Sequence, residues 1–173
     1  MTGAGGPRAV LIGTMGAGKT TVGRLVAERI GVGFADSDQL VEERCGKSVQ
    51  DIFVEDGEDA FRALERATVA RALEQHDGVL SLGGGAVLDP GTRTLLAGRP
   101  VVFLRVGLAD AVKRVGLGTG RPLLLGNVRA RVKQLLDERA PIYEALARIA
   151  VDTDGREPAV IAAEIVTALE EQP

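Results

Sequence analysis

A glycine-rich segment near the start of the chain has the residue types and spacing that bind the phosphates of a nucleoside triphosphate. Residues 13–20 read Gly-Thr-Met-Gly-Ala-Gly-Lys-Thr. Gly13, Gly16 and Gly18 let the backbone fold around a β-phosphate with successive N–H groups pointing inward. Lys19 supplies positive charge to the β- and γ-phosphates, and Thr20 supplies a hydroxyl for Mg²⁺. The predicted nucleotide contacts here are Gly16, Ala17, Gly18, Lys19, Thr20 and Thr21.

The sequence on both sides of this loop supports the interpretation. An apolar strand over residues 8–12 precedes it, and a helix with Val22, Val26 and Ile30 on one face follows it. The helix dipole therefore points its positive end at the phosphates. The alternative is a glycine-rich turn that contains a lysine by chance, and the order of strand, loop and amphipathic helix disfavours it.

Two aspartates, Asp36 and Asp38, lie at the end of the second predicted strand, which covers residues 32–36. Many phosphoryl-transfer proteins place an acid at the end of the third strand, but residues 79–82 contain none, so Asp36 and Asp38 are the available replacements. In an extended segment both carboxylates point to one side and face the cleft beside Lys19. One would hold the Mg²⁺ hydration shell, and the other would orient or deprotonate an acceptor hydroxyl. The alternative is a helix cap made by Ser37 or Asp38.

Two further segments suit the acceptor and the phosphates. Gly83, Gly84 and Gly85 follow a buried strand and offer unhindered backbone N–H groups at the carboxyl edge of the sheet. Arg121 lies between a glycine and a proline, like a lid residue that closes over phosphates and neutralises transition-state charge. An ordinary exposed loop arginine is an equally good interpretation of Arg121.

Composition narrows the setting in which this chemistry takes place. At 173 residues and 45% hydrophobic, the chain has the size of one domain with its own core. We expect a cytoplasmic protein without an export signal or membrane span. The net charge of −3 argues against a nucleic-acid partner. One cysteine, Cys45, and one histidine, His76, exclude an internal disulfide and a cysteine–histidine metal cluster.

Strands and helices alternate along the chain, which is typical of a parallel sheet covered by helices on both faces, with binding residues at the carboxyl ends of the strands. The predicted strands cover residues 8–12, 32–36, 78–82, 100–106 and 149–152. Residues 116–122 break the periodicity and predict a mobile segment. A helix from 127 to 139 follows, and Pro141 is expected to interrupt it.

In this order the motifs resemble the shikimate kinase family over about residues 8–170. The matching pieces are residues 13–20, Asp36-Ser37-Asp38, Ile52-Phe53, Gly57-Glu58, Phe61-Arg62, Leu82-Gly83-Gly84-Gly85, Arg121-Pro122-Leu123-Leu124 and Arg139-Ala140-Pro141-Ile142-Tyr143. The resemblance implies an α/β, three-layer P-loop kinase fold with a five-stranded parallel sheet of order 2-3-1-4-5. It also implies one monomeric domain over residues 1–173, with an acceptor-binding segment at about 36–63 and a mobile lid at about 115–126.

The resemblance further implies an enzyme that moves the γ-phosphate of ATP to the 3-hydroxyl of shikimate with Mg²⁺, on the route to chorismate and the aromatic amino acids. Lys19, Asp38 and Arg121 would be catalytic, and Thr20 and Asp36 would form the magnesium site. The implied shikimate-binding residues are Asp38, Phe53, Phe61, Arg62, Gly83, Gly84, Gly85 and Arg139. Within this set Arg62 and Arg139 would hold the carboxylate. Arg114 and Pro158 would enclose the adenine.

Two departures and two rivals accompany this prediction. Leu82 stands where the family often has threonine, and residues 116–120 are glycine-rich, but neither change removes a charged group. Another kinase of the same fold, such as gluconate kinase, also acts on a carboxylate, so the arginine pair alone does not exclude it. A catalytically silent ATP-binding module would lack one of Lys19, Asp38 and Arg121, and all three are present.

Overall fold

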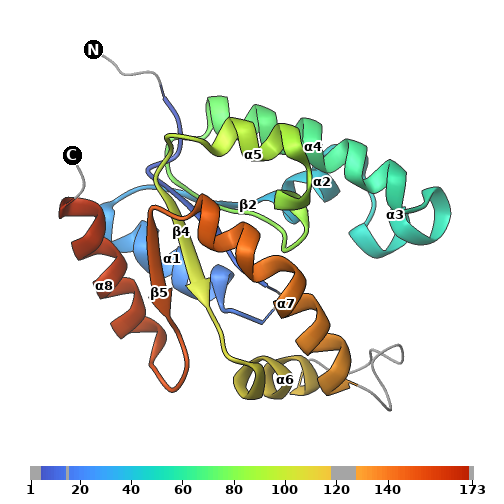
Figure 1. The fold of residues 1–173 in the computed structure, drawn as a ribbon. Coiled ribbons are helices and arrows are strands. Elements are labelled where there is room, and N and C mark those ends of the chain that lie inside the picture. The colour runs from blue at the N-terminus through green and yellow to red at the C-terminus, as the bar shows by residue number, and fades with distance from the viewer. Residues whose placement is uncertain (1–4, 15, 118–127, 172–173) are drawn as a thin grey trace.

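Five parallel strands form the centre of the computed structural model, which describes residues 5–14, 16–117 and 128–171. Their order is β2-β3-β1-β4-β5 (Figure 1). The strands are β1 (Ala9–Ile12), β2 (Phe34–Asp36), β3 (Val79–Ser81), β4 (Val101–Arg105) and β5 (Ile149–Asp152). The helices are α1 (Lys19–Ile30), α2 (Ser37–Cys45), α3 (Val49–Asp56), α4 (Glu58–Gln75), the 3₁₀ turn η1 (Ala86–Leu88), α5 (Pro90–Leu96), α6 (Leu108–Leu117), α7 (Val128–Leu146) and α8 (Pro158–Glu171). The predicted fold class and strand order are confirmed.

Alternating side chains of the strands divide the core into two layers. Leu11 of β1 faces the layer that contains α1 and α8, whereas its neighbour Val10 faces the layer that contains α4 and α5. In β4, Leu104 and Phe103 divide between the two layers in the same way. Because both faces are covered, the central strands β1 and β4 are nearly continuous apolar runs, as expected for a parallel sheet, whereas the edge strand β5 alternates buried and exposed residues. Figure 1 shows the helices on the two sides of the sheet.

A third, smaller cluster lies away from the sheet and supports the acceptor side of the molecule. Val41 of α2, Ile52 of α3 and Phe61 of α4 are buried against one another. α3 lies at the end of α4 that is remote from the sheet (Figure 1). α2, α3 and the first turn of α4 therefore form a separate wall, held by few large apolar side chains.

Pro141 does not interrupt α7, and the prediction that it would was wrong. The helix runs from Val128 to Leu146 with the proline inside it. A proline within a helix removes one backbone hydrogen bond and costs about 3 kcal/mol. The final turn is retained because Tyr143 is buried there, with its ring centroid 5.1 Å from that of Phe103 in β4. Burial of a large aromatic side chain contributes a stabilisation of comparable size.

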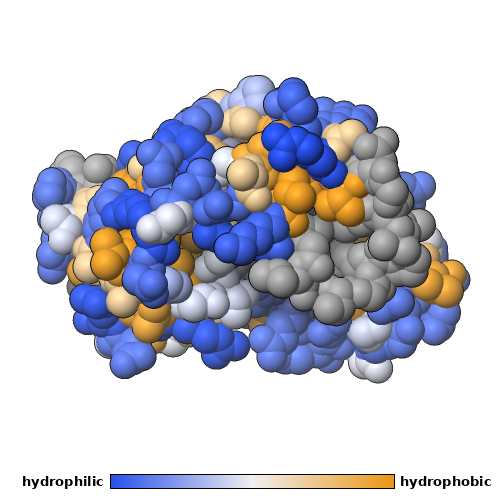
Figure 2. All heavy atoms as spheres, turned by 90° about the horizontal axis from the view of Figure 1, so that it is seen from below, coloured by the Kyte–Doolittle hydropathy of each residue, from blue (hydrophilic) through white to orange (hydrophobic). Residues whose placement is uncertain are grey.

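Apolar and hydrophilic side chains alternate over the surface. On the face shown in Figure 2, apolar side chains form separate patches among hydrophilic ones. Within the part of the chain that the structure describes, no helix combines the length and the apolar character needed to cross a membrane.

Two neighbouring glycines provide a test of the packing between β2 and β3. A Cβ added to Gly78 would lie 2.1 Å from the carbonyl oxygen of Gly33, whereas one added to Gly33 would meet nothing within 4 Å. Gly78→Ala should lower the free energy of unfolding by about 3 kcal/mol and the Tm by roughly 6–12 °C. Gly33→Ala, measured beside it by thermal denaturation, should change the Tm by less than about 2 °C. Equal shifts in the two variants would contradict this packing.

Candidate active site

A cleft of about 640 Å³ lies at the carboxyl ends of the strands and brings most of the predicted residues together. The phosphate-binding loop, α2, α3, α4, residues 83–85 and α7 contribute to its lining. The predicted residues that line it are Gly16, Gly18, Lys19, Thr20, Thr21, Asp36, Asp38, Phe53, Phe61, Arg62, Gly83, Gly84, Gly85 and Arg139. Ala17 of the phosphate-binding loop is buried and does not line the cleft. Arg121 lies outside the described residues.

The phosphate-binding loop holds its own lysine. α1 begins at Lys19, after Gly18 with a left-handed φ of 91°. The Lys19 ammonium donates hydrogen bonds to the carbonyl oxygens of Gly13 at 2.7 Å and Thr14 at 3.1 Å. Burial lowers the pKa of Lys19 from 10.5 to about 8; Asp36 and Asp38 oppose this shift, and Arg139 adds to it. The loop is thus set for an anion that would stabilise the protonated lysine.

Asp36 and Asp38 reach the cleft by a geometry other than the predicted one. β2 ends at Asp36, and α2 begins at Ser37, so the two aspartates do not share an extended segment. Asp36 itself caps α2, because its Oδ1 accepts from the N–H groups of Asp38 at 2.9 Å and Gln39 at 3.3 Å. The proposed cap by Ser37 or Asp38 was therefore assigned to the wrong residues. Asp38 still faces the cleft from the first turn of the helix.

The Asp38 carboxyl is more basic than an ordinary aspartate. Burial raises its pKa, and the neighbouring Asp36 raises it further. Lys19 and Arg62 act in the opposite direction, since their charges favour the carboxylate. A carboxylate with a raised pKa beside a phosphate-binding loop is suited to accept a proton from a hydroxyl.

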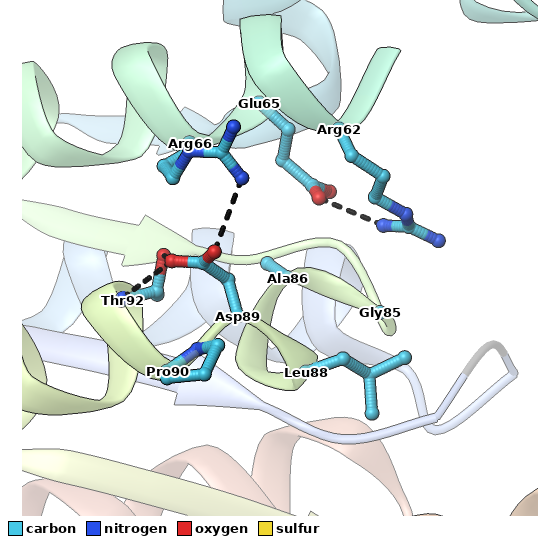
Figure 3. A pocket seen from close by; sticks show the side chains of 9 residues that line it. All are labelled: Arg62, Glu65, Arg66, Gly85, Ala86, Leu88, Asp89, Pro90 and Thr92. Carbon is cyan, nitrogen blue, oxygen red and sulfur yellow. Dashed lines mark hydrogen bonds and ion pairs between the residues drawn. The ribbon is translucent and has the colours of Figure 1, made fainter. Parts of the chain in front are cut away.

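Glu65 is a site residue that the sequence-based prediction missed. Its side chain is buried, lines the cleft, and accepts a hydrogen bond of 2.7 Å from Arg62 (Figure 3). Burial raises the pKa of Glu65, whereas Arg62 lowers it. The sequence did contain a signal for it: Glu65 is a charged residue in the same helical stripe as the apolar Phe61 and Val69, which α4 buries. The pair holds the Arg62 guanidinium in place, and a second hollow of about 240 Å³ adjoins it.

Each glycine of residues 83–85 contacts a different helix. The Gly83 N–H donates to Ser37 Oγ of α2 at 2.9 Å, and the Gly84 carbonyl accepts from the Tyr143 hydroxyl of α7 at 2.6 Å. A Cβ at Gly85 would lie 2.6 Å from the Arg62 guanidinium of α4. Among the described residues, the N–H groups of Gly84 and Gly85 have no hydrogen-bond acceptor. They are available to a ligand in the cleft.

Of the two residues expected to enclose the adenine, only one lies at the phosphate-binding loop. Arg114 of α6 donates to the carbonyl oxygen of Gly16 at 2.8 Å, so it lies on the phosphate-binding loop. Pro158 is half-buried at the start of α8 and does not line the cleft. Besides Glu65, four lining residues were not among the predicted site residues: Val49 of α3, Leu82 after β3 and, on one face of α7, Arg131 and Leu135.

Comparison with known proteins agrees with this geometry. The family model of shikimate kinase matches residues 15–170. The chain belongs to the shikimate kinase family. A shikimate kinase from Thermobifida fusca is 63% identical over 152 residues, which cover 88% of each chain. By membership of this family the chain is a kinase with ATP as its phosphoryl donor.

Solved structures separate the family from its fold relatives. A shikimate kinase from Acinetobacter baumannii, in complex with shikimate, superposes with a TM-score of 0.88 at 33% identity and covers 96% of this chain and 93% of its own. A gluconokinase from Sinorhizobium meliloti reaches a TM-score of 0.62 at 21% identity, with 96% and 92% coverage. The second likeness shows the fold alone.

The pKa of Lys19 predicts proton uptake when nucleotide binds. In the free protein at pH 8.5 most Lys19 side chains are neutral, because the pKa is about 8. Phosphates stabilise the ammonium, so binding of Mg-ADP at this pH should take up as much as about 0.8 proton, and affinity should fall as pH rises above 8. Calorimetry in two buffers of different ionisation enthalpy measures the uptake.

A lysine-to-arginine variant provides the control for this measurement. The guanidinium of Lys19→Arg stays charged at pH 8.5, so the variant should bind without proton uptake. Wild-type protein at pH 7 should take up only about 0.1 proton. Equal wild-type binding enthalpies in both buffers at pH 8.5 would show that nucleotide binding does not change the protonation of the lysine, and would contradict this prediction.

Proposed function

We propose that the chain phosphorylates the 3-hydroxyl of shikimate with ATP, which gives shikimate 3-phosphate and ADP. One observation carries the proposal: Asp38, a carboxyl with a raised pKa, lines the same cleft as Lys19 of the phosphate-binding loop and two arginines, Arg62 and Arg139. The two arginines match an acceptor that carries a carboxylate. Family membership supports shikimate as that acceptor, as does the shikimate complex of the A. baumannii relative.

The donor side binds nucleotide and magnesium. Backbone N–H groups of residues 16–21 and the Lys19 ammonium would hold the β- and γ-phosphates. The Thr20 hydroxyl and Asp36 fit Mg²⁺, because this ion usually takes one or two protein oxygens and fills its shell with water and phosphate. Asp36 uses Oδ1 as a cap, which leaves Oδ2 for a magnesium-bound water. The ion would neutralise charge on the phosphates. Arg114 would cover the adenine, and Pro158 would complete its site.

The acceptor side positions a carboxylate and a hydroxyl. Arg62 and Arg139 bind the carboxylate, while Phe53 and Phe61, with ring centroids 4.8 Å apart, form the apolar wall against the ring. The N–H groups of Gly84 and Gly85 bind oxygens of the acceptor, and Gly83 leaves room beside Asp38. The Asp38 carboxylate then accepts a hydrogen bond from the reacting hydroxyl.

The reaction transfers one phosphoryl group and one proton. The acceptor oxygen forms a bond to the γ-phosphorus, the bond from phosphorus to the β-phosphate oxygen breaks, and its electron pair leaves with ADP. Asp38 accepts the hydroxyl proton. Lys19 stabilises the charge on the transferring group. The resemblance gives Arg121 the same role from a lid at about 115–126, whose closure would exclude water.

Other features of the proposal rest on the family and on composition. We propose one domain over the whole chain, with an acceptor-binding segment at about 36–63. The monomeric state and the cytoplasmic location stay predictions. Both are consistent with a small-molecule kinase that meets its two substrates in solution.

ADP release tests the proposed reaction. Purified protein with Mg-ATP is assayed with shikimate, with gluconate and without acceptor. We expect release that depends on shikimate, a kcat reduced about 10²- to 10⁴-fold in Asp38→Asn, and a KM for shikimate raised at least about 10-fold in Arg139→Ala. Asp137→Asn is the control, since this exposed aspartate of α7 pairs with Lys133 away from the cleft.

The other outcomes of this assay are equally informative. Release with gluconate alone would retain the kinase fold and overturn the acceptor. Nucleotide binding without acceptor-dependent release would favour the catalytically silent module. An unchanged kcat in Asp38→Asn would remove Asp38 from the proton transfer.

A further inference from the structure

The buried hydroxyl of Tyr143 has no part in the chemistry described above. Tyr143 is 1% exposed in the last turn of α7, within the apolar layer that contains Leu80 and Leu82 of the β3 segment. Its ring packs on Phe103, and its hydroxyl donates a hydrogen bond of 2.6 Å to the carbonyl of Gly84. A phenylalanine would fill the same space without a polar atom. The hydroxyl therefore has a purpose beyond packing.

The acceptor of this hydrogen bond is part of the peptide between Gly84 and Gly85. In a trans peptide the carbonyl and the following N–H point in opposite directions. A Gly84 carbonyl directed at Tyr143 therefore turns the Gly85 N–H away from the core, toward the cleft that Gly85 lines. The hydrogen bond from the Ala86 N–H to the Gly83 carbonyl closes the turn around this peptide, but a peptide between two glycines meets little steric resistance to rotation, so the Tyr143 bond sets the direction in which it faces.

The same hydroxyl lies next to Arg139. Arg139 precedes Tyr143 by four residues in α7, so the two side chains are neighbours on one face. Burial raises the pKa of the Tyr143 phenol, and the Arg139 guanidinium opposes the rise. The phenol oxygen thus adjoins two groups from different elements: the Arg139 cation of α7 and the Gly84 carbonyl, whose peptide carries the Gly85 N–H on its opposite side.

We propose that Tyr143 is a positioning residue for the acceptor: its hydroxyl fixes the Gly84–Gly85 peptide and aligns Arg139 with it. This inference rests on the proposed function, in which both groups bind the acceptor. Tyr143 does not touch the nucleotide side of the cleft. Loss of its hydroxyl should therefore raise the KM for shikimate and leave the KM for ATP unchanged.

Tyr143→Phe removes the hydroxyl and keeps the ring on Phe103. We expect the KM for shikimate to rise about 10-fold, with a KM for ATP within about 2-fold and a kcat within about 3-fold of wild type. Thr68→Val is the matched control, because the Thr68 hydroxyl is also buried but has no hydrogen-bond partner among the described residues. This variant should leave both KM values unchanged.

Amide hydrogen exchange gives a second readout that does not depend on the substrate. Exchange of the Gly83 and Ala86 N–H groups, which are hydrogen-bonded to Ser37 Oγ and to the Gly83 carbonyl, should be faster in Tyr143→Phe than in wild type and unchanged in Thr68→Val. Unchanged exchange there, or an equal rise of both KM values, would overturn the positioning role. If wild-type protein proved inactive with shikimate, the proposed function would fail, and the exchange experiment would still decide whether Tyr143 orders the loop.

Discussion

The close approach of charged side chains to the backbone of residues 83–85 is the constraint on which the site depends. A Cβ at Gly83 would lie 2.7 Å from an Asp38 oxygen and 3.2 Å from a Glu65 oxygen, and one at Gly85 would lie within 3 Å of the Arg62 guanidinium. Any larger residue would displace the carboxyl that faces the acceptor or the arginine beside it. The absence of side chains lets α2, α4 and α7 converge on one short loop.

This convergence brings opposite charges together on groups that are partly or fully buried, and the pKa shifts follow from it. Burial raises the pKa of Asp38 and Glu65 and lowers that of Lys19, because the surroundings disfavour the charged form of each group. The ion pair between Arg62 and Glu65 limits the penalty for burying both. The positive charge that this ion pair leaves unbalanced in the cleft favours ligands that are themselves anionic, as ATP and a carboxylate-bearing acceptor are.

Periodicity and local motifs account for most of what could be predicted. The alternation of strands and helices and the phosphate-binding loop depend on residues close in sequence, so they were predictable, and the strand order followed from the resemblance. Glu65 was missed because its partner Arg62 was expected to bind substrate, and a buried pair cannot be inferred from one charged position in a stripe. Asp38 was expected in an extended segment with Asp36 because the capping role of Asp36 depends on where β2 ends. Pro141 was misjudged because the packing of Tyr143 on Phe103 is a long-range contact that outweighs a local propensity.

The position of the single tyrosine also gives the protein a built-in optical label. The chain contains no tryptophan and one tyrosine, and that ring lies beneath the glycine loop. Fluorescence excited at the long-wavelength end of protein absorption therefore originates almost entirely from this ring beneath the acceptor site. The same is true of the aromatic region of the circular dichroism spectrum. Spectroscopy of the unlabelled chain observes that ring without background from the rest of the fold.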